Sequence, residues 1–487
     1  MSLCVLSLAA GSDFAGNTNV HPVGLAAVIA ASLAILMVPR QNATVVLLLL
    51  AAFIPSAQRL VIGGADFNFV RLLVLVGLVR LVIRSELRWV KPNSIDCCVA
   101  FGALARIACA PLARGTSADL IAAIGSNFEL VGSYTILRST VRGIADVRHL
   151  ARGAAFTALI VVPFFLVERY TGRNGFAMFG GIPEITNIRE GRIRCRGAFS
   201  HAILAGCFFV AWLPIWIALF MSGGRDRWIG TLGAVCGAVI VFCCASSTPT
   251  VALILGLLVW MAFPLRAWLR PLYLSALGCG FILHFLMTQP IWHLIARIDL
   301  VGGSTGIHRF RLIDAAIKRF SEWWFAGTPS TAHWGWGLQD VTNQFVLEAV
   351  RGGVWALVAM VAVFVLGYAC VGSELRRLAK RKFAAQRIRA NASFRQHSRD
   401  ELLVFGIGAA LFAQMAIFLA VSYFGQSMIV WQFFMAIAGS MRQWTLHPTF
   451  DKHKYEVTQS KAVVESVHRC HDRLRVSPLP VLPRRWP

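Results

Sequence analysis

Residues 290–353 read PIWHLIARIDLVGGSTGIHRFRLIDAAIKRFSEWWFAGTPSTAHWGWGLQDVTNQFVLEAVRGG and form the longest polar interruption in a chain made mostly of apolar runs about one bilayer long. From Gly306 to Phe325, apolar residues recur every three or four positions, with charged residues between them. This spacing predicts an amphipathic helix. The tryptophans at its end and the basic residues on its polar face indicate that it lies along a membrane surface. The apolar positions are Phe310, Ile313, Ile317, Phe320 and Trp324.

The composition of the whole chain supports a membrane setting. Of 487 residues, 57% are hydrophobic and only 14% are charged, whereas soluble domains carry about 25% charged residues. We therefore expect an all-α fold, a polytopic integral membrane helical bundle with about 12–13 transmembrane helices. The expected spans are 22–39, 43–62, 69–84, 95–112, 120–137, 150–167, 199–221, 228–246, 249–264, 271–288, 345–371, 401–420 and 423–440.

One apolar stretch is too long to cross the bilayer once. As a single helix, residues 228–264 would measure about 55 Å, against a hydrocarbon core of about 30 Å. The sequence Ser246-Ser247-Thr248-Pro249 interrupts the stretch near its middle. We therefore expect a helical hairpin here.

Several classes of protein are disfavoured. Lys and Arg number 47 against 23 Asp and Glu, a formal net charge of +24, but the basic residues cluster in loops, as membrane topology requires, so we expect no nucleic-acid partner. Most of the 12 cysteines fall inside apolar runs, and none has zinc-ligand spacing, so we expect no metal. The N-terminus has no basic region followed by a cleavage motif, which predicts no cleaved signal peptide.

The distribution of basic residues predicts which loops face the cytoplasm. Residues 373–400 carry a dense run of Arg and Lys, and the tail 441–487 is also basic. Loops of this kind stay in the cytoplasm. Counting spans from these loops leaves two long polar segments, 168–198 and 289–344, on the extracytoplasmic face. They separate N-terminal spans within 1–167, central spans within 199–288 and C-terminal spans within 345–440.

The first of these segments, 168–198, is net positive, although the charge rule predicts few basic residues outside the cytoplasm. A miscounted span, which would make the loop cytoplasmic, is the alternative. Arginine suits anions with several oxygens, because its guanidinium donates in a fork that matches phosphate. We therefore expect a phosphate-bearing ligand in that compartment, and a diphosphate lipid fits best. Arg194 and Arg196 would lie at the depth of its headgroup. His201 follows one turn later, as a site residue or as an interfacial histidine bonded to the backbone.

These residues belong to a longer pattern. It resembles the O-antigen ligase and O-antigen polymerase family of bacterial envelope glycosyltransferases, over about residues 150–375. The residues that carry the resemblance are Arg194 and Arg196-Gly197 before a span, His201 and Gly206 inside it, Arg309 at the head of a helix, Gly335-x-Gly337, Asn343 and Gly352-Gly353.

The resemblance implies an enzyme of the bacterial inner membrane with its active face outside the cytoplasm. Such enzymes transfer a glycan from an undecaprenyl-diphosphate-linked saccharide to a sugar hydroxyl, without metal or other cofactor. Both polymerases and ligases share the pattern, and a polymerase works with a chain-length regulator. The resemblance assigns Arg196 or Arg194, together with Arg309, to the donor diphosphate, whose charge they stabilise as it leaves.

The chain departs from the family where a His-Asn pair activates the acceptor. It has Thr342-Asn343 there, and threonine is no general base at neutral pH. Asn343 stays in the expected site, and we favour Asp340 as the base. An N-cap of the next helix is the alternative role of Asp340. The other candidate bases are His201, His308, His333 and Glu348.

Aromatic residues in the same segment are candidates for stacking on sugar rings. Trp324, Trp334 and Trp336 have the required flat faces, and membrane anchoring is their alternative role.

Two other functions compete with the transferase: a flippase of the lipid-linked oligosaccharide, and a non-catalytic subunit of envelope polysaccharide assembly. Two long loops and the lack of an internal repeat favour the transferase over the flippase.

Overall fold

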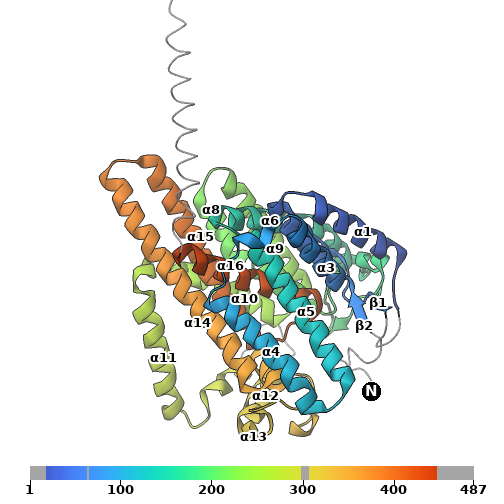
Figure 1. Cartoon of the computed structure of the whole chain (residues 1–487). Helices are drawn as coiled ribbons and strands as arrows, with labels where there is room; N and C mark the ends of the chain where they lie inside the picture. Colours follow the sequence, from blue (N-terminus) through green and yellow to red (C-terminus); the bar gives the residue numbers. More distant parts are fainter. Residues whose placement is uncertain (1–17, 63–64, 298–305, 447–487) are drawn as a thin grey trace, which may run out of the picture. The chain divides into compact units, whose positions relative to one another are not determined.

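Helices make up nearly all the regular structure in the computed structural model, which describes residues 18–62, 65–297 and 306–446 (Figure 1). Most of the tail 441–487 therefore lies outside the described residues. The α-helices are α1 (Pro22–Met37), α2 (Arg40–Phe53), α3 (Phe69–Ile83), α4 (Ser94–Arg114), α5 (Ser117–Thr140), α6 (Ile144–Thr171), α7 (Ala202–Val210), α8 (Leu213–Ser222), α9 (Arg225–Cys244), α10 (Ser247–Met261), α11 (Leu269–Leu286), α12 (Gly306–Lys318), α13 (Phe320–Trp323), α14 (Gln344–Arg387), α15 (Asn391–Phe418) and α16 (Met428–Leu446).

Seven of the described helices are long and apolar enough to cross a membrane, counting α7 and α8 as one. Four shorter apolar helices accompany them. The protein is thus an all-α membrane protein that crosses the bilayer several times, as its composition predicts. The larger total of about 12–13 spans stays a prediction. The seven are α4, α5, α6, α7 with α8, α9, α14 and α15.

The expected span 43–62 is wrong in its second half. Helix α2 ends at Phe53, and β1 (Arg59–Ile62) pairs in antiparallel fashion with β2 (Ala65–Asn68). Pro55 explains the early end, because proline restricts the residue before it to extended conformations and cannot donate a helical hydrogen bond. Hydropathy alone did not separate this apolar strand from the helix before it.

The break expected within 228–264 is confirmed. Helix α9 ends at Cys244, Ala245 adopts a left-handed conformation with φ of 44°, and α10 begins at Ser247. Helix α10 packs closely on α7, since a Cβ on Gly206 would lie 2.7 Å from Cγ of Pro249. The α7–α8 pair is the most enclosed apolar segment, with 83% of its apolar window buried.

The basic segment 373–400 is largely helical, although the sequence suggested a loop. Helix α14 continues to Arg387 and α15 begins at Asn391, so the two form the long hairpin at the upper left of Figure 1. After a kink at Gly352 and Gly353, α14 continues to Arg387, and this second part alone is about 50 Å long and extends past a bilayer core. Alanine, leucine, lysine and arginine all favour helix, so the charges that mark this segment as polar do not interrupt the helix.

The predicted amphipathic helix of 306–325 forms as two pieces, α12 and α13, with a break at Arg319. Its buried face differs from the predicted apolar stripe: Leu312, Ala316 and Trp323 pack into a small core with Trp334. The predicted stripe is partly or fully exposed and leaves an apolar surface on the outside of the segment. The clearly exposed members are Ile317, Phe320 and Trp324, followed by Phe325.

Candidate functional site

A buried carboxylate fixes the arginine segment, which we define as residues 194–197. Glu168, near the end of α6, is fully buried and accepts hydrogen bonds from the backbone N–H groups of Arg196 and Gly197, both at 3.0 Å. The hydroxyl of Thr186 donates a third, at 2.8 Å. Burying a carboxylate is costly unless hydrogen bonds compensate it, so Glu168 holds the backbone in one conformation.

Close packing at Gly197 adds to this constraint. Gly197 has a φ of +55°, and a Cβ there would lie 2.5 Å from Cε2 of Phe165. Its carbonyl accepts from the Asn174 amide at 2.8 Å, and the next carbonyl, of Ala198, accepts from Gln426 at 2.7 Å. Only glycine fits this left-handed, enclosed position, so the side chains of Arg194 and Arg196 project from a rigid backbone.

Three arginines of the site are enclosed without an acidic partner. In the described part of the chain, no carboxylate forms an ion pair with Arg194, Arg196 or Arg309, and the Nε of each is buried without a hydrogen bond. Burial lowers the pKa of each guanidinium from its ordinary value, yet arginine stays charged in proteins. Three positive charges are therefore partly desolvated without an ion pair, although Glu168 and Glu190 favour the charges of Arg196 and Arg194 from a greater distance.

Many other enclosed arginines among the described residues pair with neighbouring carboxylates, although Arg142 and Arg169, also partly buried, form no ion pair either. A buried charge normally requires such a partner, because desolvation is costly. Three such arginines without ion pairs are suited to binding an anion. Examples of paired arginines are Arg80 with Glu86, Arg106 with Glu348, Arg138 with Asp96, Arg148 with Asp400, and Arg152 with Asp226.

Arg309 comes from the second polar segment and reaches into the bundle. It is only 7% exposed, and its Nη2 donates to Oγ1 of Thr248, at the start of α10, at 2.9 Å. Its side chain also lies near Cys207 in α7. The segment before α7 thus places its arginines near His201, and α12 places Arg309 at the start of α10. That the three bind one diphosphate stays a prediction.

His201 precedes α7 and has charged neighbours from both polar segments. Burial of much of its ring lowers its pKa, as do Arg194 and Arg196, whereas Asp340 opposes them. His201 as a whole residue is exposed, and its ring packs edge-on to that of Phe424, with 6.2 Å between the ring centroids. A neutral imidazole with an accessible face is able to accept a proton.

Asp340 is exposed and is not the N-cap of α14. That role belongs to Asn343, whose Oδ1 accepts from the N–H of Val346 at 3.1 Å. The Asn343 amide also donates to the carbonyl of Leu419 at 3.1 Å, so its side chain holds α14 in place. A ring nitrogen of His308 lies 3.0 Å from the carbonyl oxygen of Asp340, which positions the loop that carries this carboxylate.

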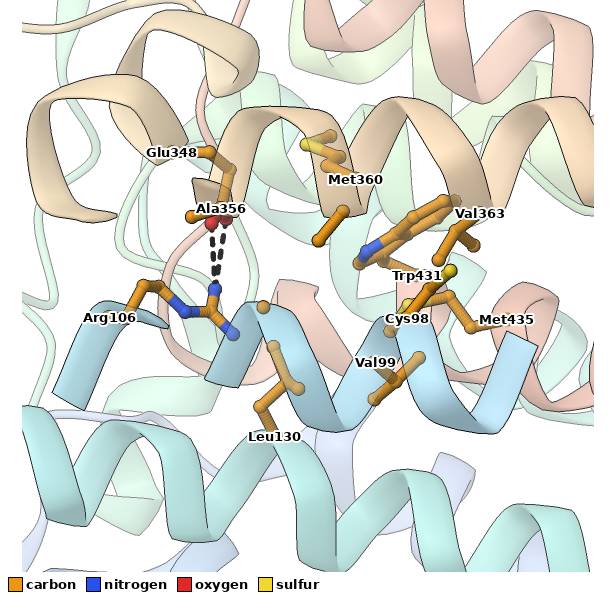
Figure 2. A pocket seen from close by; sticks show the side chains of 12 residues that line it. Cys98, Val99, Arg106, Leu130, Glu348, Ala356, Met360, Val363, Trp431 and Met435 are labelled. Atoms are coloured by element: carbon orange, nitrogen blue, oxygen red, sulfur yellow. Dashed lines mark hydrogen bonds and ion pairs between the residues drawn. The ribbon is translucent and has the colours of Figure 1, made fainter. Parts of the chain in front are cut away.

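Glu348 lies away from these residues in an apolar pocket between α4 and α14. Figure 2 shows its carboxylate paired with the guanidinium of Arg106, with the shorter N–O distance at 2.9 Å. The amide of Gln344 also donates to Glu348, at 2.9 Å. The rest of the lining is mostly apolar, including Trp431 and Met435. A carboxylate held by an ion pair is a poor general base, so the geometry disfavours Glu348 in that role.

His333 and Trp334 are engaged with Glu322. A ring nitrogen of His333 lies 2.7 Å from the Glu322 carboxylate, and the indole N–H of Trp334 donates to the same oxygen at 3.0 Å. The hydrogen bond with His333 is the largest cause that lowers the pKa of Glu322, to about 2. Trp334 is only 7% exposed and packs in the core of the segment, so it is no platform for a sugar.

The other two tryptophans stay accessible. Trp336 is 94% exposed and Trp324 is 44% exposed. Their faces are open either to a sugar or to a membrane interface.

Among the described residues, no group of three or more His, Cys, Asp or Glu is arranged to hold a metal ion.

Sequence reasoning missed the part played by Glu168, which it counted only as a charge of the first loop. Its partners Thr186, Arg196 and Gly197 lie 18 to 29 residues further along the chain. The available signal was its position at the end of an apolar run, where an acidic residue is costly unless it is paired.

Comparison of the sequence with models of protein families and with curated proteins found no match.

Proposed function

We propose that the protein is an integral membrane glycosyltransferase that transfers a saccharide from a lipid diphosphate to a sugar hydroxyl on the extracytoplasmic face. One observation carries the proposal: Arg194, Arg196 and Arg309 are partly buried near α7 and form no ion pair among the described residues. A diphosphate supplies several oxygens in the geometry that guanidinium groups recognise. The surrounding apolar helices provide a natural environment for the lipid tail of such a donor.

In the proposed reaction, the acceptor hydroxyl attacks the anomeric carbon of the donor sugar. The bond between that carbon and the diphosphate oxygen breaks, and negative charge grows on the departing lipid diphosphate. Arg194, Arg196 and Arg309 stabilise this growing charge, which is the largest contribution expected from preorganised donors in an enclosed site. The chain's own residues are sufficient for this chemistry, so no cofactor is invoked.

The acceptor proton passes to His201 in this proposal. Its imidazole is kept neutral by burial and by the nearby arginines, while the carboxylate of Asp340 favours the imidazolium that forms. Asp340 itself, the base favoured from the sequence, is the alternative, because it is exposed on the loop before α14. The exposed Trp324 and Trp336 are the candidates to hold sugar rings.

The proposed setting is the inner membrane of a bacterium, with both polar segments outside the cytoplasm and the α14–α15 hairpin inside it. The strongly basic residues of that hairpin support this orientation. In this arrangement, the exposed apolar side of α12 and α13 lies on the extracytoplasmic surface of the inner membrane. Polymerases and ligases both fit the site, and a chain-length regulator is the expected partner of a polymerase.

Purified protein in detergent micelles tests the proposal. Incubated with an undecaprenyl-diphosphate-linked oligosaccharide and a saccharide acceptor, without metal ions or nucleotides, it should yield a longer glycan and free undecaprenyl diphosphate. A flippase moves its substrate across a bilayer but breaks no bond, so it yields no product in micelles. Absence of the longer glycan with every acceptor supplied, alongside lipid movement in reconstituted vesicles, would favour the flippase.

A further inference from the structure

The thiol group of Cys195 lies between the two arginines of the arginine segment and contacts a second cysteine. The backbone N–H of Cys195 donates to the carbonyl oxygen of Cys243, in the last turn of α9, at 3.1 Å. The last carbonyl groups of a helix lack partners within the helix, so this bond satisfies one of them. It also fixes the two residues side by side.

The side chains of the two residues are also neighbours. The thiol of Cys195 shares a hydrogen bond with that of Cys243, and both residues are essentially inaccessible, at 0% and 1% exposure. A disulfide needs an S–S distance of about 2.05 Å and Cβ atoms about 3.5–4.5 Å apart. The backbone hydrogen bond between Cys195 and Cys243 already brings the two residues next to each other.

We propose that Cys195 and Cys243 form a disulfide bond in the mature protein, which fastens the arginine segment to the end of α9. The proposal rests on the extracytoplasmic position of this segment under the proposed function, because disulfides persist in oxidising compartments. Two thiols lose two protons and two electrons as the S–S bond forms. A dithiol oxidase of that compartment accepts the electrons, and its own disulfide is reduced to two thiols.

The bond forms before the segment packs. In the folded protein, the hydrogen bond to Cys243 and burial raise the pKa of the Cys195 thiol, and the thiolate is the form that attacks a disulfide. During folding both thiols are still open to an oxidase. Once buried, the disulfide is protected from reductants, and it holds Arg194 and Arg196 in addition to the hydrogen bonds of Glu168.

Counting free thiols in full-length protein from the native membrane tests the proposal. The protein is denatured and alkylated with N-ethylmaleimide, with or without prior reduction, and its mass is measured. The unreduced protein should carry two fewer labels than the reduced protein. Cys195→Ser and Cys243→Ser should each abolish this difference. Cys236→Ser is the matched control, since Cys236 is also buried and precedes Cys243 in α9. This variant should still show the difference of two labels.

Two outcomes would overturn the proposal. Equal labelling of reduced and unreduced wild-type protein means that no disulfide forms. A difference that survives Cys195→Ser but disappears in Cys244→Ser or Cys207→Ser means that the neighbouring thiols pair instead. Either failure is separate from failure of the proposed function: transfer activity without the disulfide refutes only the disulfide, and a disulfide without transfer activity refutes only the enzyme.

Discussion

At the scale of single residues, the unusual feature is positive charge without a counter-charge. The enclosed guanidinium groups of Arg194, Arg196 and Arg309 lack the carboxylates that accompany many other enclosed arginines of this chain. A protein tolerates such charges where a ligand supplies the opposite sign. The backbone under two of them is fixed by Glu168, so little order is lost when the anion binds.

The two candidate bases give different pH profiles. Because burial, Arg194 and Arg196 lower the pKa of His201, the wild-type rate should fall only below its ordinary value of about 6.5. If His201 is the base, Asp340→Asn removes a charge that raises this pKa, so the acid limb should move to lower pH. The limb should disappear in His201→Gln. Rates of glycan transfer between about pH 4 and 8 provide the measurement.

A different profile would identify Asp340 as the base. In that case Asp340→Asn should lower the rate by more than about tenfold at every pH, and His201→Gln should keep an acid limb. Asp314→Asn is a suitable control, since Asp314 pairs with Lys318 at 2.8 Å on the same polar segment. Its profile should match that of the wild type.

Glu168→Gln tests the support under the arginines. The amide keeps the size of the side chain but is a weaker hydrogen-bond acceptor. Its NH₂ group would also face one of the three donors that now bind the carboxylate, which are the N–H groups of Arg196 and Gly197 and the hydroxyl of Thr186. We expect a loss of about 1–3 kcal/mol in stability, as for a broken buried hydrogen-bond set, and a lower melting temperature in detergent. Glu184→Gln, on an exposed residue of the same segment, should melt as the wild type does.

At the scale of elements, a glycine pair lets the second polar segment dock on α14. Gly352 and Gly353 break the helical conformation inside α14, and Gly353 has a φ of +63°. A Cβ there would lie 2.4 Å from the carbonyl oxygen of Phe325. The kink also lets the N–H of Val354 donate to the carbonyl of Trp324 at 2.8 Å. Each half of α14 therefore presents a different face to the segment.

Gly353→Ala should displace the segment that carries Arg309. Both the left-handed conformation and the close approach to Phe325 exclude a methyl group. Transfer activity should fall at least about tenfold, while the membrane helices still assemble, so the protein should elute as wild type in size-exclusion chromatography. Gly278→Ala is the control, because a Cβ at Gly278 meets nothing within 4 Å. Full activity in Gly353→Ala would show that the kink does not position the site.

The sequence predicted the helices well because an apolar run about 20 residues long has few other structures in a membrane. Its errors occurred where local signals were ambiguous. The apolar strand at 59–62 continues the run of α2, and the charges of 373–400 lie on helix ends rather than in a loop. The later part of the predicted stripe, Ile317, Phe320 and Trp324, turned out to be exposed, since tertiary packing selected Leu312 and Ala316 instead.

The candidate site was only partly predictable. Arginine at the ends of spans, with His201 after it, is visible as a pattern in one dimension. The cap that Asn343 forms on α14 is local, because its partner Val346 lies three residues further on, and a capping pattern could have indicated it. The pairing of Glu348 with Arg106 and the burial of Trp334 depend instead on residues far along the chain. Such pairings follow from the packing of whole helices, which no local spacing encodes.

At the scale of the whole molecule, the proposed orientation is testable with fusions. A reporter that is active only outside the cytoplasm should give a signal at Gly181, in the first polar segment, and at Ser330, in the second. At Ala390, in the turn between α14 and α15, it should be silent, since the basic residues around it stay inside. A silent reporter at Gly181 with normal protein level would place the arginine segment in the cytoplasm.

The central claim is that the unpaired arginines bind a donor diphosphate, and glycan transfer by Arg196→Lys in micelles tests it most directly. Lysine keeps the charge but loses the forked donor geometry, so kcat/KM should fall at least about tenfold, with melting temperature unchanged. Arg173→Lys, on an exposed arginine of the same polar segment that pairs with Glu184, should retain the wild-type value. Wild-type kcat/KM in Arg196→Lys, and also in Arg194→Lys and Arg309→Lys, would contradict the account.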